Sequence, residues 1–213
     1  MVIYKYDNSS REILEVTLNT PFFPFFGNAL WIDFLNTQPA LPGGGRGDLI
    51  DRPEAFELWA RAAGVLGPHD PFASDQGEME AVRCFRATLR EGAESLLIGS
   101  PPPKTTIGAV NEMLARSPVV SALVEKDTGW DLTSRFAAGM ATALLGKVAA
   151  NFAQTLVSGR PDRLRRCEHP GCVMLFIDTS KNGKRRWCSM ETCGNREKAA
   201  GYRARAKRSG ESA

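Results

Sequence analysis

The sequence has no long apolar run and few histidines, and both features restrict what the protein can be. No apolar stretch reaches the roughly 20 residues that a helix needs to cross a bilayer, and the N-terminus lacks the pattern of a signal peptide. We therefore expect a cytoplasmic protein with no membrane contact, in a compartment where thiols stay reduced. Only two histidines are present, and no set of nucleophile, base and acid can be assembled. An enzyme is therefore not expected, and an active site in the N-terminal domain is the least favoured alternative.

Positive charge is in small overall excess but is unevenly distributed. The formal net charge is +3 at pH 7, yet residues 159–213 contain 14 Lys and Arg against 6 Asp and Glu. The rest of the chain is therefore acidic on balance. A basic segment of this kind predicts a polyanionic partner. A solvated tail that only improves solubility is the alternative.

Helix and turn signals divide the chain into a mainly helical first part and a short second part. Apolar residues spaced three and four apart, with start and stop signals, predict helices over residues 28–37, 51–67, 74–99, 106–117 and 134–159. The last of these is rich in alanine and is expected at the centre of the domain. β-rich runs predict strands at 2–6 and 13–18 and a hairpin over 119–136. We expect an α+β fold with a predominantly helical N-terminal domain and short β-hairpins.

Four of the five cysteines lie close together near the C-terminus. Cys167 and Cys172 form one pair and Cys188 and Cys193 the other, with four residues inside each pair and fifteen between the pairs. Each pair lets two thiolates face one point, and four thiolates complete the tetrahedral shell of structural zinc at ~2.3 Å. The spacing predicts Zn²⁺ bound by these four residues, in a closed shell that leaves no position for catalysis.

Other interpretations of the cysteines stay open. Disulfides need an oxidising compartment, redox pairs are usually more closely spaced, and an iron–sulfur cluster also uses four thiolates. His169 lies inside the first pair and is an alternative ligand, but four thiolates fill the shell, so we expect it beside the site. Cys84 lies in a predicted helix, where its simplest role is a small buried apolar side chain.

The residues around the cysteines predict a treble-clef-like unit of knuckle, β-hairpin and helix. The apolar run 173–178 predicts a strand, the dipeptide Asn182-Gly183 predicts a hairpin turn, and residues 185–187 would return to the second pair. A helix-forming segment follows. About 45 residues cannot bury an adequate core alone, and metal binding of ~10–16 kcal/mol would supply the missing stability. We therefore divide the chain into a helical domain over 1–160 and a zinc finger over 161–213.

Lysine and arginine surround the cysteines, on the expected turn and return strand and on the terminal helix. Positions 196, 203 and 207 share one face of that helix. Cations on a rigid metal-bound unit predict contacts with a phosphate backbone. The candidate nucleic-acid-binding residues are Lys181, Lys184, Arg185, Arg186, Arg196, Arg203, Arg205, Lys207 and Arg208. DNA is the expected partner, RNA could make the same contacts, and docking onto an acidic protein is the alternative.

Polar residues on either side of a glycine-rich loop form a candidate ligand site in the N-terminal domain. These residues are Asp33, Asn36, Thr37 and Arg52, and they could line a pocket for a small-molecule or protein effector. Helix capping and loop hydrogen bonds are the competing interpretation. The glycine run at 43–47 is not a phosphate-binding loop, because no Lys-Ser/Thr follows it.

Two stretches of the sequence resemble known families. The segment 167–207, with the tetrapeptide Cys193-Gly194-Asn195-Arg196 and the elements "F-x-D-x-S" and "RRWCSM", resembles the CGNR zinc-finger family. Upstream, "FGNALWIDFLNT", the glycine-rich loop and "DLIDRPEAFELWARAAGVL" resemble the ABATE domain, which accompanies this finger. Together the two resemblances cover nearly the whole chain.

The resemblance implies a bacterial transcription regulator that responds to stress. The finger would bind zinc through its four cysteines and DNA through the surrounding cations, and the N-terminal domain would sense a ligand. Because one finger has a small footprint on DNA, we also expect a homodimer, although no heptad seam marks the interface.

Overall fold

The computed structural model describes residues 3–6, 13–16, 23–41, 44–67, 69–136, 139–158 and 161–210. A first antiparallel hairpin pairs β1 (Ile3–Tyr6) with β2 (Ile13–Val16). The helical body follows, with α1 (Leu30–Leu35), α2 (Pro53–Ala62), α3 (Gln76–Leu97), α4 (Lys104–Arg116) and α5 (Met140–Val157). Between α4 and α5, β3 (Val119–Lys126) and β4 (Gly129–Phe136) form a second hairpin.

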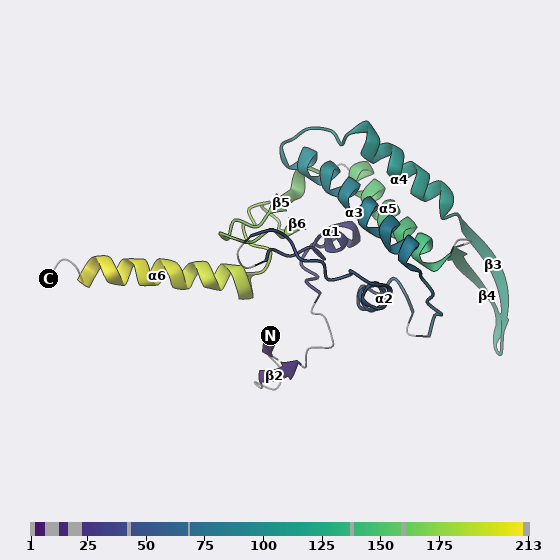
Figure 1. The fold of residues 1–213 in the computed structure, drawn as a ribbon, viewed down its shortest axis with the longest axis horizontal. Helices are drawn as coiled ribbons and strands as arrows, with labels where there is room; N and C mark the ends of the chain where they lie inside the picture. Colours follow the sequence, from purple (N-terminus) through teal and green to yellow (C-terminus); the bar gives the residue numbers. More distant parts are fainter. Residues whose placement is uncertain are drawn as a thin grey trace.

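The C-terminal part contains a third hairpin and a long helix. The one-turn helix η1 (Pro161–Arg163) leads into β5 (Leu164–Arg166), which pairs antiparallel with β6 (Leu175–Ile177). A π-helical turn, η2 (Met190–Gly194), then runs directly into α6 (Asn195–Gly210). In Figure 1, α6 extends away from the body on the side opposite to the β3–β4 hairpin.

Local signals account for where the helices begin. At the start of α3, the Asp75 carboxylate accepts a hydrogen bond from the Glu78 backbone N–H at 2.8 Å, and the Glu78 carboxylate accepts one from the Asp75 N–H at 3.2 Å. This reciprocal pair satisfies two N–H groups that a helix start leaves unpaired. Pro53 opens α2, where its fixed φ suits the first helical position.

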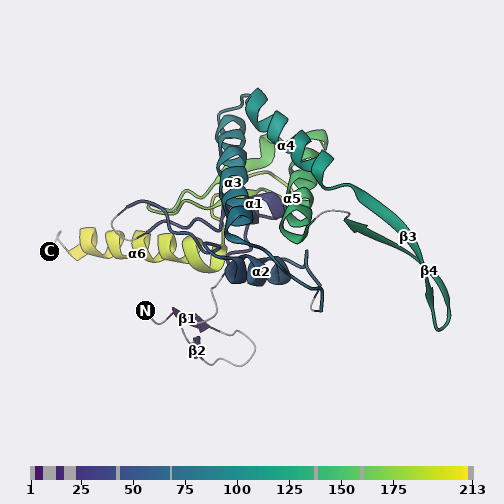
Figure 2. The ribbon, with the colours of Figure 1, turned by 45° about the vertical axis from the view of Figure 1, so that its right-hand side comes forward.

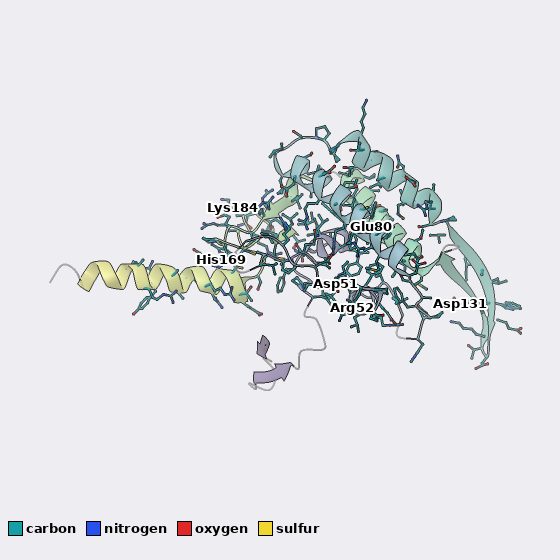
Figure 3. The ribbon with its side chains drawn as sticks, in the orientation of Figure 1. Asp51, Arg52, Glu80, Asp131, His169 and Lys184 are labelled. Carbon is teal, nitrogen blue, oxygen red and sulfur yellow. The ribbon has the colours of Figure 1, made fainter. Side chains whose placement is uncertain are left out.

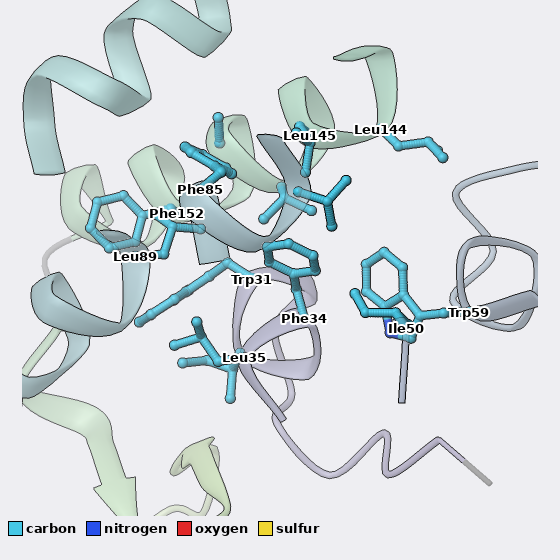
Figure 4. Close-up of a cluster of buried hydrophobic side chains, with 14 of the residues drawn as sticks. Trp31, Phe34, Leu35, Ile50, Trp59, Phe85, Leu89, Leu144, Leu145 and Phe152 are labelled. Atoms are coloured by element: carbon cyan, nitrogen blue, oxygen red, sulfur yellow. The ribbon is translucent and has the colours of Figure 1, made fainter. Parts of the chain in front are cut away.

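The core of the body lies between α1, α3 and α5 (Figures 2 and 4). The Trp31 ring packs edge-on against Phe152 of α5 with 5.0 Å between centroids, and Phe34 contacts Trp59 of α2 at 5.5 Å. The Trp31 indole N–H donates to the Thr155 hydroxyl at 2.9 Å, so a buried polar group keeps a partner. The helix expected at the centre is thus α5.

The zinc-finger segment shares this core rather than standing apart from it. Leu164 of β5 and Leu175 of β6 are buried in the same apolar cluster as the helices of the body. The predicted boundary at residue 160 stays a prediction, but the two regions it separates pack as neighbours. No described helix is long and apolar enough to cross a membrane.

The α+β architecture expected from sequence is confirmed, with two differences in detail. The predicted hairpin about Asn182-Gly183 is wrong, because β6 pairs with β5 instead. Cys84 is exposed, with its Sγ 3.4 Å from a Glu80 carboxylate oxygen, and is not a buried apolar residue. The turn that joins β1 to β2 lies outside the described residues.

Candidate metal centre and basic helix

The four paired cysteines converge on one point. Their Sγ atoms all lie within 4.8 Å of one another, with 3.9 Å between Cys172 and Cys188 and 3.7 Å between Cys188 and Cys193. Sulfurs at the corners of a tetrahedron with bonds of ~2.3 Å to a central zinc are about 3.8 Å apart. Bonded disulfide sulfurs would be only ~2 Å apart. The observed spacing therefore suits metal ligands, and these cysteines are free of disulfides.

The first pair is positioned by the loop that closes the β5–β6 hairpin. The backbone N–H of Cys167 donates to Met174 at 2.9 Å, across the loop. Gly171 has φ +78, a left-handed conformation that glycine adopts without strain and that turns the chain just before Cys172. The N–H of Cys188 points at Cys167 Sγ, 3.4 Å away, so the backbone of the second pair also contacts a sulfur of the first.

The second pair sits where η2 begins and ends. The Ser189 hydroxyl accepts a hydrogen bond from the Thr192 N–H at 3.3 Å and caps this turn. A Cβ at Gly194 would meet Met190 Sδ at 2.5 Å and Trp187 Cδ1 at 3.1 Å, so a larger residue directly after Cys193 would require the Met190 side chain to move. Because α6 starts at the next residue, the metal centre fixes the root of that helix.

Arg185 braces the metal centre from inside the protein. Its Nε donates to the Trp187 carbonyl at 2.9 Å, and its Nη2 donates to the carbonyls of Cys188 and Phe26. Its guanidinium also lies over the Phe176 ring, 4.3 Å from the centroid. A guanidinium presents its donors in a fixed fork, so Arg185 holds the backbone of the second pair in place. Few of its donors remain for a nucleic acid.

Asp178 explains why the predicted return strand is absent. Its buried carboxylate accepts hydrogen bonds from the backbone N–H groups of Ser180 and Arg185, at 2.9 and 3.0 Å. Its own N–H donates to the Arg163 carbonyl at 2.8 Å. A side chain thus takes the backbone donors that a strand partner would have used. Sequence reasoning missed this role, although Asp178 belongs to the quoted "F-x-D-x-S" element.

The other candidate cations of the loop after β6 lie at the surface. Lys181, Lys184 and Arg186 are exposed, and Lys184 projects from the finger in Figure 3. Arg186 forms an ion pair with Glu168 at 2.5 Å and lies over the Trp187 ring at 4.7 Å from its centroid. Such an exposed pair contributes little to stability, so Arg186 can exchange Glu168 for another anion.

The cations of the terminal helix lie along the segment that projects from the protein. Arg196, Arg203 and Arg205 are exposed on α6, and Lys207 and Arg208 follow in the same helix. The root of α6 is tied to the first cysteine pair, because His169 Nδ1 lies 2.7 Å from a Glu197 carboxylate oxygen. His169 therefore orients the helix and does not join the four sulfur ligands.

The polar residues proposed as a ligand site have partners within the protein. The Asn36 side chain donates to the Leu175 carbonyl and accepts from the Leu175 N–H, each at 2.9 Å. The Thr37 hydroxyl donates to Phe34 at 2.6 Å and accepts from Arg86 at 2.7 Å. Both residues are buried. They connect α1 to the finger and to α3, and the ligand site stays a prediction.

Asp33 and Arg52 also have partners within the protein. The Asp33 carboxylate accepts the Gly27 N–H at 2.8 Å, and burial raises the pKa of Asp33 to about 6. The Gly27 carbonyl in turn accepts from the Ile177 N–H at 2.8 Å, so Asp33 supports a second link to the finger. Arg52 is exposed and pairs with Asp51 at 3.3 Å (Figure 3).

The thiols of Cys172, Cys188 and Cys193 have shifted pKa values. A hydrogen bond with Cys188 lowers the pKa of Cys172 to about 5, and the same interaction raises the pKa of Cys188. Burial raises the pKa of Cys193 to about 11. Metal binding to such a set displaces the remaining thiol protons, which couples metal affinity to pH.

Fold and site together define a helical domain that carries a four-cysteine, treble-clef-like finger with a projecting basic helix. Comparison with known families gives the same division. Residues 28–159 match ABATE, described as "Putative stress-induced transcription regulator", and residues 163–206 match the CGNR zinc finger. The chain therefore belongs to the ABATE family and carries a CGNR zinc finger. No curated protein matches it.

Proposed function

We propose that this protein is a DNA-binding transcription regulator in which a structural Zn²⁺ holds the finger and α6 contacts DNA. The observation that carries the proposal is the placement of α6. This helix projects away from the body (Figure 1) and carries exposed cations, and its first turn is held by Cys193 and by the contact between His169 and Glu197. Cations that are held in place along a projecting helix can contact the phosphates of a nucleic-acid backbone.

Zn²⁺ is the metal that best suits the ligand set. Four thiolates favour zinc or an iron centre, and the sulfur separations of 3.7 and 3.9 Å fit the tetrahedron of a single ion. Bound at this point, zinc would join the β5–β6 loop to the start of α6. A closed shell of four sulfurs leaves no water on the metal, so we propose a structural role and no catalysis.

The dimensions of α6 suit a groove of duplex DNA. Sixteen residues span about 24 Å at ~1.5 Å per residue, which exceeds the ~12 Å width of the major groove. Arg196 and Arg203 are seven residues apart and share one face. Phosphates on both sides of the groove could therefore be reached along one helix, with Lys181, Lys184 and Arg186 as additional contacts.

A direct test measures the binding of purified, zinc-loaded protein to a labelled random-sequence duplex by fluorescence anisotropy. We expect affinity to fall steeply with salt, because each neutralised phosphate releases a counterion. Replacing Arg196 and Arg203 by Gln should reduce the magnitude of the salt slope by about two. The control is Arg116→Gln, which removes an exposed cation from α4. An unchanged slope in the α6 variant would contradict the proposal.

The same assay separates the alternative partners. A structured RNA of equal length tests whether the contacts discriminate against ribose, and an acidic protein retained by a nuclease-treated sample would favour a protein partner. We further propose that the helical body senses an effector, that two copies act together on DNA, and that the protein works in the cytoplasm, where thiols stay reduced.

A further inference from the structure

Four arginines gather where the helical body meets the finger. Arg46 lies in the glycine-rich loop, Arg86 and Arg90 lie one turn apart on α3, and Arg166 ends β5. None of them belongs to the cysteine centre or to α6. Arg86 is fully buried and paired with Asp48, whereas the other three are partly or largely exposed. We call Arg46, Arg90 and Arg166 the junction arginines.

Hydrogen bonds place the junction arginines at one end of α1. Arg90 donates to the carbonyl of Leu35 at 2.5 Å, and Arg46 donates to that of Gln38 at 3.3 Å. These two acceptors belong to the same turn, because the Gln38 N–H itself donates to Leu35 at 3.2 Å. Two guanidiniums therefore meet at the C-terminal end of one short helix.

The third junction arginine reaches this end of α1 from the finger. Arg166 faces Leu175 in the β5–β6 register. The backbone of Leu175 is held by Asn36, the residue that directly follows α1. Arg166 also pairs with Glu94 at 2.5 Å, one helical turn after Arg90 on α3. The junction arginines thus come from three elements to one place.

Positive charge exceeds negative charge at this place. The charged groups that act on Arg90 are Glu94 and three cations, namely Arg46, Arg86 and Arg166, of which Arg86 is already paired with Asp48. Burial and these like charges lower the pKa of Arg90 to about 10, and burial together with Arg166 lowers the pKa of Arg46. Guanidiniums that repel one another at a partly buried place gain from an anion that bridges them.

The junction also has unused hydrogen-bond donors. The Nε atoms of Arg86 and Arg90 are buried and have no partner among the described residues. A buried donor without an acceptor costs about 1–3 kcal/mol. Capping the carbonyls of α1 uses one contact from Arg90 and one from Arg46, although each guanidinium carries five N–H donors. Capping alone therefore does not explain why three guanidiniums are placed together.

We propose that Arg46, Arg90 and Arg166 bind a small anion that carries a phosphate or carboxylate group. Guanidiniums contact both groups through paired N–H donors. The anion would touch the glycine-rich loop and α3 of the body together with β5 of the finger. Its binding would therefore stabilise one placement of the finger on the body. This proposal does not depend on DNA binding, and its test contains no nucleic acid.

The test titrates the full-length, metal-loaded protein with inorganic phosphate by calorimetry, at constant ionic strength set with sodium chloride. A parallel titration uses succinate as the carboxylate probe. We expect saturable binding of at least one probe at one site per chain. Arg46→Gln, at an exposed loop position, should weaken that binding at least tenfold. The matched control, Arg116→Gln on α4, should leave it unchanged.

One further variant tests whether charge alone or paired donors bind the anion. Arg90→Lys keeps the charge but loses the paired donors, so we expect weaker binding with an unchanged far-UV circular dichroism spectrum. If neither probe binds saturably, or if Arg46→Gln binds as tightly as the unmodified protein, the proposal is overturned. If Arg46→Gln loses affinity for a duplex while phosphate and succinate never bind, the junction arginines contact nucleic acid, and the small-anion site is likewise rejected.

Discussion

Asn36 is the single residue that most directly joins the body to the finger. It is 2% exposed, and its amide makes two hydrogen bonds to the fully buried Leu175, in the way that one strand would bind another. Asn36→Ala removes both partners from a buried backbone. Because each unsatisfied group costs about 1–3 kcal/mol, we expect the free energy of unfolding in urea to fall by about 2–4 kcal/mol.

A matched control for this prediction lies at the opposite end of α1. Asn28 also donates to the finger, to the Ile177 carbonyl at 2.9 Å, but it is exposed and has φ +57. Asn28→Gly keeps that backbone conformation and loses only exposed hydrogen bonds, to the Ile177 carbonyl and to the Thr179 hydroxyl, so we expect a change of about 1 kcal/mol or less. Equal losses for the two variants would contradict the role assigned to Asn36.

Neighbouring arginines of the finger are expected to differ in what they do. Arg185 is turned inward and donates to the carbonyls of Trp187 and Cys188, whereas Arg186 is exposed and paired with Glu168. Residues that support metal ligands typically change metal affinity by ~10–100-fold when removed. We therefore expect Arg185→Ala to weaken zinc binding at least roughly tenfold in competition with a fluorescent chelator, and Arg186→Ala to leave it unchanged.

The same two variants separate metal binding from DNA binding. With zinc in excess, Arg186→Ala should lower affinity for the duplex in the anisotropy assay, because it removes an exposed cation. Arg185→Ala should lower it only to the extent that the finger is no longer fully loaded. If Arg185→Ala kept the zinc affinity of the unmodified protein and lost only DNA affinity, Arg185 would be a direct contact instead of a brace.

At the scale of elements, the β3–β4 hairpin presents an apolar face to solvent. Strand alternation and the register place Val119, Leu123, Trp130 and Leu132 on one face, and each is 58–68% exposed. Lys126 and Asp131 form an ion pair at 2.6 Å on the opposite face. In Figures 1 and 2 this hairpin projects from the body.

Substitution on that face should therefore cost little. Leu132→Asn loses a cross-strand contact with Leu123, which is worth ~0.2–1 kcal/mol, and leaves no cavity. We expect the free energy of unfolding to change by no more than about 1 kcal/mol. Leu89→Ala, at a fully buried position of α3, should cost about 2–5 kcal/mol in the same urea titration. A large loss for Leu132→Asn would show that this face is covered in solution.

The elements of this protein differ in how far the sequence predicts them. Helices with strong local signals, such as α3 with its Asp75–Glu78 capping box, are found where the spacing places them. The finger hairpin is not, because β5 has only three residues and its pairing depends on contacts between distant parts of the chain. The Asn182-Gly183 signal does give a turn, but Asp178 takes the N–H groups that a strand would have used.

The site shows the same division between local pattern and long-range contact. The convergence of the four cysteines follows from their spacing, since each pair needs only one tight turn. The inward rotation of Arg185 and the meeting of Arg46, Arg90 and Arg166 depend on elements that are far apart in sequence. No periodic pattern marks such residues. Residue type alone does not distinguish an arginine that faces the interior from an arginine at the surface.

At the scale of the whole molecule, finger and body share one apolar core. Leu164 and Leu175 of the finger lie among the side chains of the helical body. Asn36 and Gly27 of the body form hydrogen bonds with the backbone of β6. A finger on a free linker could lose its metal without consequence for its neighbour. Here, loss of metal should loosen β5 and β6 and expose part of the core of the body.

We therefore expect removal of zinc by a chelator to lower the melting temperature of the helical body as well as that of the finger. Near-UV circular dichroism is recorded on a Trp187→Phe variant, which lacks the tryptophan that packs against the cysteines, so the signal reports mainly on Trp31 and Trp59, which are fully buried in the body. Zinc release is followed with a metal-sensitive dye. One shared transition that shifts by several degrees is expected, since ~1 kcal/mol moves the midpoint by about 2–4 °C in a protein of this size. Cys84→Ser, at the exposed cysteine outside the centre, should behave like the unmodified protein. Two separate transitions, with the tryptophan signal unaffected by chelation, would show instead that the finger folds independently of the body.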